Sequence, residues 1–187
     1  MALGMQHVTF PDRRTCPAPG LGTWRMGESQ RERAAEVAAV RLALDIGHRI
    51  IDTAEMYGDG GAEEVVGQAL AEATFAWGLS RDEVFVVSKV CPHNASRDGV
   101  SAAWTWTAST STCCSGAAST PWHRQSRASR LRSHGDTSRW GVSNFDVDDK
   151  QELAAVGGGA ACASNQAHYS LGERAPSDFS AAVNTEP

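Results

Sequence analysis

The sequence has no long apolar run, no cluster of basic residues and no cysteine pair in C-x-x-C spacing. Its longest apolar runs fall far short of the roughly 20 residues that a transmembrane helix needs, and no basic segment followed by an apolar one stands at the start. The formal net charge of −5 opposes the clustered positive charge that nucleic-acid binding requires. We therefore expect no signal peptide, no membrane partner and no nucleic-acid partner.

The cysteines follow no metal-binding or disulfide pattern, because they are odd in number and irregularly spaced. Paired cysteines at short spacing are typical of structural zinc sites, so their absence predicts that the protein has no metal centre. We expect a reducing, cytoplasmic compartment. The five cysteines are Cys16, Cys91, Cys113, Cys114 and Cys162.

A dinucleotide-binding fingerprint is also missing. Gly20 and Gly22 resemble its first two glycines, but no third glycine stands three residues after Gly22, and no helix opens directly there. Tight-turn chemistry explains the two glycines equally well. The sequence therefore does not predict a Rossmann-type cofactor domain.

The pattern that is present alternates short β-branched runs with amphipathic segments. The 187 residues suffice for one domain with a sizeable core. Strands separated by single helices pair in parallel with right-handed crossovers, so the sequence predicts the α/β class. The expected apolar stripe of the first helix consists of Ala34, Val37, Ala38, Val40, Arg41, Leu42 and Leu44. The expected strands are residues 18–24, 49–54, 84–90, 140–145 and 163–166, the expected helices are 31–45, 62–73 and 147–156, and residues 7–10 and 13–15 are expected to form a hairpin.

Two segments depart from this alternation. Residues 102–138 have neither a strand nor a helix period and include a portion crowded with Arg and Ser, so we expect a non-native or disordered segment there. Residues 176–187 are expected to be an irregular tail. The predicted organisation is a single domain over 1–187 that is interrupted at 102–138.

Three ionisable side chains stand at or just past predicted strand ends: Asp52, Tyr57 and Lys89. In βα barrels, catalytic groups sit at the carboxyl ends of the strands. An Asp–Lys pair there brings an ammonium near the tyrosine, which favours the phenolate and lowers the pKa of Tyr57 below its usual ~10. Such a phenol can give a proton to a carbonyl oxygen as hydride reaches the carbon. The alternative is a structural Asp–Lys pair beside a surface tyrosine.

Short motifs occur together in the order and spacing of one known family. They are G-x-G-T-W at residues 20–24, D-T-A-x-x-Y-G at 52–58, S-K at 88–89, G-V-S-N-F at 141–145 and N-Q at 165–166. On these residues the chain resembles the aldo-keto reductase family, over about 18–101 and 139–172. The resemblance implies an incomplete (β/α)8 TIM barrel in which strands 1–3 and 5–6 are recognisable, strand 4 is garbled and strands 7–8 are absent. It also implies that NADPH (NADP in its oxidised form) binds across the carboxyl mouth of the barrel.

The resemblance also implies roles for individual residues. Tyr57 would be the general acid, with Asp52 and Lys89 lowering its pKa. Trp24 would lie near the substrate, and His93 would line the pocket, with a solvated loop histidine as the alternative. The residues implied to hold the cofactor are Thr23 near it, Ser143, Asn144 and Gln166 on the carboxamide of the nicotinamide, and Tyr169 stacked on that ring.

The resemblance fails at the family's fourth strand, which carries a catalytic histidine. Residues 105–116 show neither a strand pattern nor a histidine. Back-translating residues 104–115 with common codons and reading one nucleotide out of phase gives approximately L-D-L-D-R-L-D-L-Y-L-L, which is close to that fourth strand. We therefore hypothesise a frameshifted stretch, with the native phase resuming near Leu131. An open barrel leaves strand edges unpaired, so we expect low stability, aggregation or a need for a partner.

The function predicted on these grounds is NADPH-dependent reduction of a small aldehyde or ketone to an alcohol. One alternative is a catalytically inactive reductase fragment that acts at most as a binding module. Another is a non-redox (β/α) barrel fragment that uses Asp52 and Lys89 for lyase or isomerase chemistry. This last alternative requires a phosphate site, which the sequence does not show.

Overall fold

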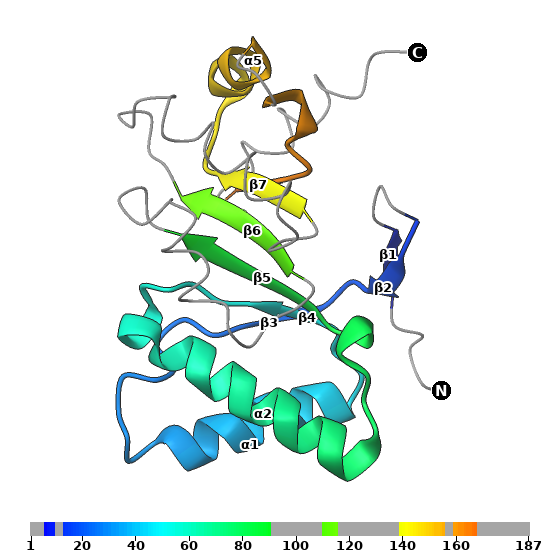
Figure 1. The fold of residues 1–187 in the computed structure, drawn as a ribbon, viewed down its shortest axis with the longest axis vertical. Helices are drawn as coiled ribbons and strands as arrows, with labels where there is room; N and C mark the ends of the chain where they lie inside the picture. The colour runs from blue at the N-terminus through cyan, green and yellow to red at the C-terminus, as the bar shows by residue number, and fades with distance from the viewer. Residues whose placement is uncertain (1–5, 10–12, 91–109, 116–138, 156–158, 168–187) are drawn as a thin grey trace.

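The computed structural model describes residues 6–9, 13–90, 110–115, 139–155 and 159–167. Within these residues the largest element is a six-stranded sheet in which every neighbouring pair is parallel. The spatial order of the strands equals their order in the chain (Figure 1). The predicted α/β class with parallel strands is therefore confirmed. The strands are β3 (Gly20–Gly22), β4 (Ile50–Asp52), β5 (Phe85–Val90), β6 (Thr110–Ser115), β7 (Arg139–Ser143) and β8 (Asn165–Gln166).

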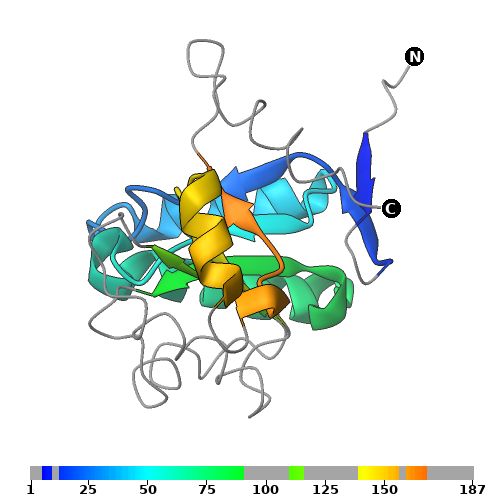
Figure 2. The same cartoon turned by 90° about the horizontal axis from the view of Figure 1, so that it is seen from above.

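Among the described residues three helices connect strands of this sheet. Helix α1 (Arg33–Asp45) joins β3 to β4, α2 (Gly61–Trp77) joins β4 to β5, and α5 (Val147–Ala155) follows β7. In Figure 1, α1 and α2 lie at the bottom and α5 at the top, so the strands lie between them; Figure 2 shows α5 nearest the viewer. The short 3₁₀ turns are η1 (Tyr57–Gly60), η2 (Arg81–Glu83) and η4 (Gly159–Ala161).

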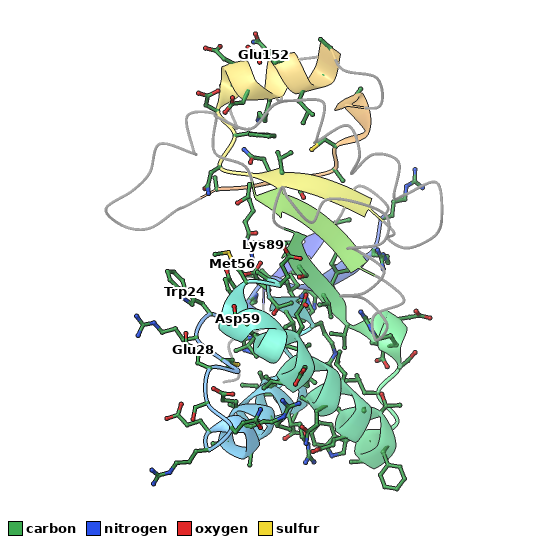
Figure 3. All side chains as sticks on the ribbon, turned by 60° about the vertical axis from the view of Figure 1, so that its left-hand side comes forward. Trp24, Glu28, Met56, Asp59, Lys89 and Glu152 are labelled. Atoms are coloured by element: carbon green, nitrogen blue, oxygen red, sulfur yellow. The ribbon has the colours of Figure 1, made fainter. Side chains whose placement is uncertain are left out.

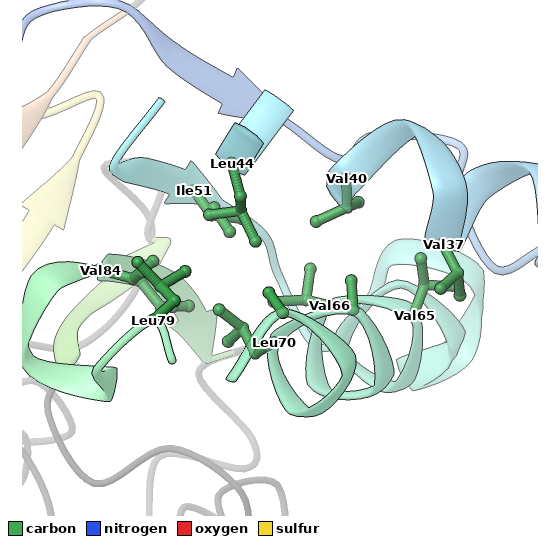
Figure 4. Close-up of a cluster of buried hydrophobic side chains, with 12 residues drawn as sticks. Val37, Val40, Leu44, Ile51, Val65, Val66, Leu70, Leu79 and Val84 are labelled. Atoms are coloured by element: carbon green, nitrogen blue, oxygen red, sulfur yellow. The ribbon is translucent and has the colours of Figure 1, made fainter. Parts of the chain in front are cut away.

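The main core lies between the sheet and the first two helices (Figure 4). Ile51 of β4 and Val86 of β5 point into it, because alternate strand residues face the helix layer. The apolar stripe expected in the first helix is confirmed only in part, because Val37, Val40 and Leu44 are buried. Ala34 and Ala38 are exposed, and so is Leu42, whose side chain is 60% exposed. The helix residues in this core are Val37, Val40 and Leu44 of α1 and Val65, Val66, Ala69, Leu70 and Ala73 of α2.

The predicted hairpin near the N-terminus is present as β1 (His7–Thr9) and β2 (Thr15–Pro17), paired antiparallel. Its second strand begins two residues later than expected. The reason is that Arg13 has a φ of +67°, a left-handed conformation that belongs to the turn and not to a strand. Figure 1 shows the hairpin at the tail end of the β5 arrow, where the Arg14 guanidinium lies 4.5 Å from the centre of the Phe85 ring.

The expectation of no strand within residues 105–116 is wrong. Strand β6 occupies Thr110–Ser115 and pairs with β5 on one side and β7 on the other. The pairing uses backbone N–H and C=O groups, which any extended residue provides, and a central parallel strand has no polar–apolar alternation to reveal it. Residues 102–109 and 116–138 of the segment expected to be non-native, and the expected tail 176–187, lie outside the described residues.

Candidate active site

Strand β5 places a lysine on the sheet face opposite the helices. Val86 and Ser88 are buried on the helix side, so Lys89 points to the other face. The register pairs Asp52 of β4 with Val87 of β5. Lys89 is two residues further along the same face, at the carboxyl end of the sheet, where its side chain reaches back to the aspartate. Strand pairing alone therefore brings the two predicted residues together.

The ammonium of Lys89 is fully engaged. Its Nζ donates to Asp52 Oδ1 at 2.8 Å, to Asp52 Oδ2 at 2.7 Å and to the Thr53 carbonyl at 2.9 Å. These bonds use all three donors of the ammonium, and the two to the carboxylate are charge-assisted. Because Lys89 is only 9% exposed and its ammonium is held by three hydrogen bonds, this cation has a fixed position at the rim of the sheet.

Tyr57 lies against this cation. It is the first residue of η1, five residues after the end of β4, and its ring centre is 5.1 Å from Lys89 Nζ. The Trp24 ring stacks on it at a centroid distance of 6.3 Å with 12° between the planes. Figure 3 shows Trp24 and Met56 on the same side of the molecule as Lys89, and both are exposed. The structure thus brings Asp52, Tyr57 and Lys89 together, as the sequence predicted.

The turn that carries Tyr57 depends on glycine. Gly58 has a φ of +57°, and a Cβ on it would lie 2.7 Å from the carbonyl carbon of Gly27. Gly27 belongs to the loop after β3, and its N–H donates to Glu36 Oε2 of α1 at 2.9 Å. The close contact between the two glycines therefore fixes η1 against the segment that follows β3.

Thr23 and Trp24 follow β3 at the same end of the sheet. Thr23 is fully buried, and both its N–H and its hydroxyl donate to the Asp52 carbonyl, at 2.9 and 3.0 Å. The threonine therefore ties the end of β3 to the end of β4. This bond positions the next residue, Trp24, whose side chain is 74% exposed beside Tyr57.

A glutamine from the far strand completes the cluster. Gln166 Nε2 of β8 donates to Asp52 Oδ1 of β4 at 2.8 Å, although β5, β6 and β7 lie between the two strands in the sheet. The sheet must curl strongly for this contact to form. Gln166 Oε1 is buried and has no hydrogen-bond partner among the described residues.

Ser143 is the last residue of β7, Asn144 follows it, and both donate hydrogen bonds to Gln166. The Ser143 hydroxyl donates to the Gln166 carbonyl at 3.0 Å, and the Asn144 N–H donates to the same oxygen at 2.9 Å. Asn144 has a φ of +60°, a left-handed conformation that asparagine tolerates, and its side chain is exposed. The three residues predicted to hold a carboxamide are therefore adjacent. Tyr169 and His93 lie outside the described residues.

Two supporting residues were not predicted. Asn165 accepts from the Phe145 N–H at 3.3 Å and donates to the Phe145 carbonyl at 2.7 Å, which ties the end of β7 to β8. Glu63 Oε1 of α2 accepts from the Ser88 hydroxyl at 2.6 Å, directly behind Lys89. Asn165 belongs to the N-Q motif, so the sequence marked it as a candidate site residue. Nothing in the sequence around Glu63 distinguishes it from a solvated helix residue.

The environment of Glu63 favours its neutral form. Burial raises the pKa of the Glu63 carboxyl, the hydrogen bond from Ser88 lowers it in part, and the charge of Glu55 raises it further. Among the described residues no group of three or more His, Cys, Asp or Glu side chains could hold a metal ion. The same part of the chain contains no helix long and apolar enough to cross a membrane.

Comparison with known proteins places this arrangement in a family. The profile of the Aldo/keto reductase family matches residues 20–113. Methylglyoxal reductase YeaE of Escherichia coli (strain K12) is 41% identical over 175 residues, which cover 89% of this chain and 59% of that protein. The chain therefore spans about three-fifths of the length of this relative.

Solved structures agree with the sequence match. An aldo-keto reductase from Klebsiella pneumoniae in complex with NADPH superposes with a TM-score of 0.76 at 39% identity, over 89% of this chain and 59% of that one. An aldo/keto reductase from the same species in complex with NADP and acetate gives 0.77 at 38% identity, over 91% and 60%. Since the family profile covers half of the sequence and includes Asp52, Tyr57 and Lys89, the chain belongs to the aldo/keto reductase family.

Proposed function

We propose that this chain is an NADPH-dependent oxidoreductase that reduces the carbonyl group of a small aldehyde or ketone to an alcohol. The observation that carries the proposal is the cluster of Asp52, Tyr57, Lys89 and Gln166 at the carboxyl ends of the strands. An isolated structural ion pair would not require an aromatic ring over the ammonium or an amide from β8 on the carboxylate. The family membership supports the same activity.

The bond between β4 and β8 supports a barrel as the complete architecture. The contact of Gln166 with Asp52 requires the sheet to curl far enough to bring its second and sixth strands together. We infer that β3 to β8 are six consecutive strands of an incomplete (β/α)8 barrel, whose interior face carries Lys89 and Asp52. The structural relatives from Klebsiella pneumoniae superpose on this arrangement.

The residues present fit a nicotinamide carboxamide. Gln166 Oε1 is buried without a described partner, and a buried acceptor gains free energy when an amide N–H reaches it. The bond from Gln166 Nε2 to Asp52 keeps this oxygen oriented. The exposed side chain of Asn144 stands next to it, and Ser143 holds the glutamine backbone. We assign Gln166, Asn144 and Ser143 to the carboxamide and Thr23 to the neighbourhood of the cofactor, with Tyr169 proposed to stack on the ring.

The proton in this reaction comes from Tyr57. NADPH, when bound, supplies the hydride to the carbonyl carbon. The Tyr57 hydroxyl then donates its proton to the carbonyl oxygen, and Lys89 stabilises the phenolate that remains, because its positive charge is fixed 5.1 Å from the ring centre. Asp52 holds Lys89 in place through both of its carboxylate oxygens.

The substrate is proposed to bind against Trp24. Its ring is exposed, stacks on Tyr57 and forms an apolar wall beside the proton donor. Met56 is 61% exposed nearby (Figure 3). His93, which lies outside the described residues, is proposed to line the pocket. Such a site suits a small carbonyl compound, and methylglyoxal is the natural first probe because a relative is named for its reduction.

Cofactor binding and turnover test the proposal together. NADPH titrated into the chain should quench or shift its tryptophan fluorescence, and adding methylglyoxal should then consume NADPH. Gln166→Leu should weaken NADPH binding by about tenfold, since it removes the carboxamide acceptor, which corresponds to about 1.4 kcal/mol. Gln68→Leu, on the exposed surface of α2, is the matched control. Binding that is equal in both variants, or the absence of NADPH consumption, contradicts the proposal.

A further inference from the structure

The segment that carries Tyr57 is attached to strand β5 at both of its ends. Ahead of the tyrosine, the Glu55 N–H donates to the Lys89 carbonyl at 3.2 Å. After the tyrosine, Glu63 Oε1 of α2 accepts from the Ser88 hydroxyl at 2.6 Å. Ser88 and Lys89 are consecutive residues of β5, so both attachments lie within one residue of the lysine that faces the Tyr57 ring.

The backbone between Tyr57 and α2 has an unusual path. Gly58, Asp59 and Gly60 have φ values of +57°, +51° and +92°, so three consecutive residues are in the left-handed region. A residue such as aspartate rarely adopts this conformation, and it persists only where the surrounding structure holds it. The position of Tyr57 therefore depends on how firmly the first turn of α2 is held.

A helix cap does not explain Glu63. A glutamate in the first turn of a helix often belongs to a capping box, which also needs a serine or threonine at the N-cap. The N-cap residue of α2 is Gly60, which has no side chain. The neighbouring Ala62 and Val66 are fully buried, and burial raises the pKa of the Glu63 carboxyl. An apolar side chain would avoid this desolvation, so the carboxyl group has a role beyond packing.

The bond to Ser88 gives Glu63 such a role. We propose that Glu63 is a positioning residue for proton transfer, which fixes the start of α2 on β5 through Ser88 and so keeps Tyr57 in place. With the tyrosine held there, its ring centre stays 5.1 Å from Lys89 Nζ. A displacement of about 1 Å in a reacting group can slow catalysis on the order of 100-fold. The inference rests on the proposed reductase function and assigns Glu63 no contact with substrate or cofactor.

Glu63→Ala and Glu63→Gln test the proposal, with Glu64→Ala as the matched control. Alanine removes the acceptor, whereas the amide oxygen of glutamine can still accept from the Ser88 hydroxyl. Glu64 is the next residue of α2, and it pairs with Arg33 of α1 while its side chain is 66% exposed. The control therefore removes a carboxylate from the same helical turn and leaves the bond to β5 intact. Circular dichroism and urea denaturation establish that all three variants are folded under the assay conditions.

Turnover of methylglyoxal with NADPH shows whether Glu63 acts through Tyr57. Glu63→Ala should lower kcat by about 10- to 100-fold, while Glu63→Gln and Glu64→Ala should keep most of the original rate. The affinity for NADPH should be the same in all three variants. In the Tyr57→Phe background, Glu63→Ala should cause no further loss, because the proton donor that it positions is already gone. An equal loss in both backgrounds, or a kcat of Glu63→Ala equal to that of Glu64→Ala, would overturn the proposal.

Hydrogen exchange separates this inference from the reductase function, because it needs no turnover. The Tyr57 N–H donates to the Ala54 carbonyl at 3.0 Å. This amide should exchange about tenfold faster in Glu63→Ala than in Glu63→Gln or Glu64→Ala, since the segment opens more often when the start of α2 is released. Faster exchange in a chain that reduces no carbonyl compound would contradict the reductase function and support the positioning of Tyr57. Unchanged exchange in Glu63→Ala would overturn the positioning role, whether or not the chain is active.

Discussion

Lys89 and Asp52 form the pair on which the site is built. The lysine side chain is 10% exposed and the aspartate side chain 27%. Removing one partner of such a pair leaves an uncompensated charge at the rim of the sheet, where it is poorly solvated. Asp52 also accepts from Gln166, so a change at Lys89 is expected to affect β8 as well as β4.

Lys89→Met should destabilise the chain strongly. Breaking a buried ion pair costs ~3–5 kcal/mol, and the partial exposure of Asp52 places the expected loss near the lower end. Urea denaturation of the single variants and of the double variant Lys89→Met with Asp52→Asn gives the coupling. The double variant should lose clearly less than the sum of the two single losses. If the two single losses simply add, the ion pair between Lys89 and Asp52 makes no joint contribution to the free energy of unfolding.

The protonation of Glu63 should make stability depend on pH. The pKa of its carboxyl is raised in the folded protein above the ordinary value of 4.5, chiefly by burial. The folded state therefore binds the proton more tightly than the unfolded state. The stabilisation that this tighter proton binding gives the folded state is fully present below the ordinary pKa of the carboxyl. It is lost as pH rises through the pKa that Glu63 has in the folded protein.

The Glu63→Gln variant tests this sign. Glutamine cannot ionise, and its amide oxygen can still accept from the Ser88 hydroxyl. Relative to the original chain, the variant should gain unfolding free energy as pH rises from about 4.5 to neutrality. Urea denaturation at several pH values measures the difference. A difference that stays flat across this range, or falls, would contradict the assignment.

At the residue scale, sequence reasoning succeeded where a residue's position in a motif implied its partner. Asp52, Tyr57 and Lys89 stand at strand ends in a known motif order, and parallel pairing brings such residues together. Glu63 could not be found in this way, because its partner Ser88 is 25 positions away and neither residue is unusual for its element. Contacts of this kind become visible only when the register and the rotation of the helix are known.

At the element scale, α1 has one apolar face that is buried in the main core and apolar residues on its other side that are exposed. Leu44 is 2% exposed in the main core, and Leu42, two positions earlier, is 60% exposed. The two residues have the same side chain and lie on the same helix. They therefore separate the effect of burial from the effect of helix propensity.

Leu44→Ala should cost ~2–5 kcal/mol, because it removes buried methyl groups and leaves a cavity. Leu42→Ala should change the free energy of unfolding by no more than about 0.5 kcal/mol, as is usual for exposed positions. Thermal or urea denaturation of both variants measures this difference. Equal losses would mean that Leu42 is buried in solution, by a partner or by another part of the chain.

The elements themselves were predicted to different degrees. Helices α1 and α2 and strand β5 followed from periodicity and from β-branched runs, because burial on one face imposes those patterns. Strand β6 was missed, because backbone pairing on both edges holds it without any side-chain pattern. The start of β2 was misplaced, since the left-handed Arg13 has no marker in the sequence.

At the scale of the whole molecule, the curl of the sheet gathers the site from distant segments. The bond between Gln166 and Asp52 joins residues 114 positions apart. The residues of β6 lie between these segments, and we hypothesise that the chain over residues 104–115 is read in a shifted phase. The backbone position of β6 between β5 and β7 is that of the fourth strand of the sheet counted from β3.

The encoding DNA tests the frameshift hypothesis. Read one nucleotide out of phase, the codons for residues 104–115 should give a peptide close to L-D-L-D-R-L-D-L-Y-L-L. Sequencing the gene across residues 100–140 provides the answer directly. Codons that give no such peptide in the shifted phase would show that the segment belongs to the native sequence of this chain.

The proposed reductase activity depends on Tyr57, which lies beside the fixed ammonium of Lys89 and supplies the proton in carbonyl reduction. The most direct measurement is NADPH consumption with methylglyoxal by the original chain and by Tyr57→Phe, with NADPH binding measured in parallel. We expect Tyr57→Phe to lower the rate by about 10²–10⁴-fold, which is typical of removing a general acid, and to leave NADPH binding nearly unchanged. Turnover that persists in Tyr57→Phe at the original rate would contradict this role of Tyr57.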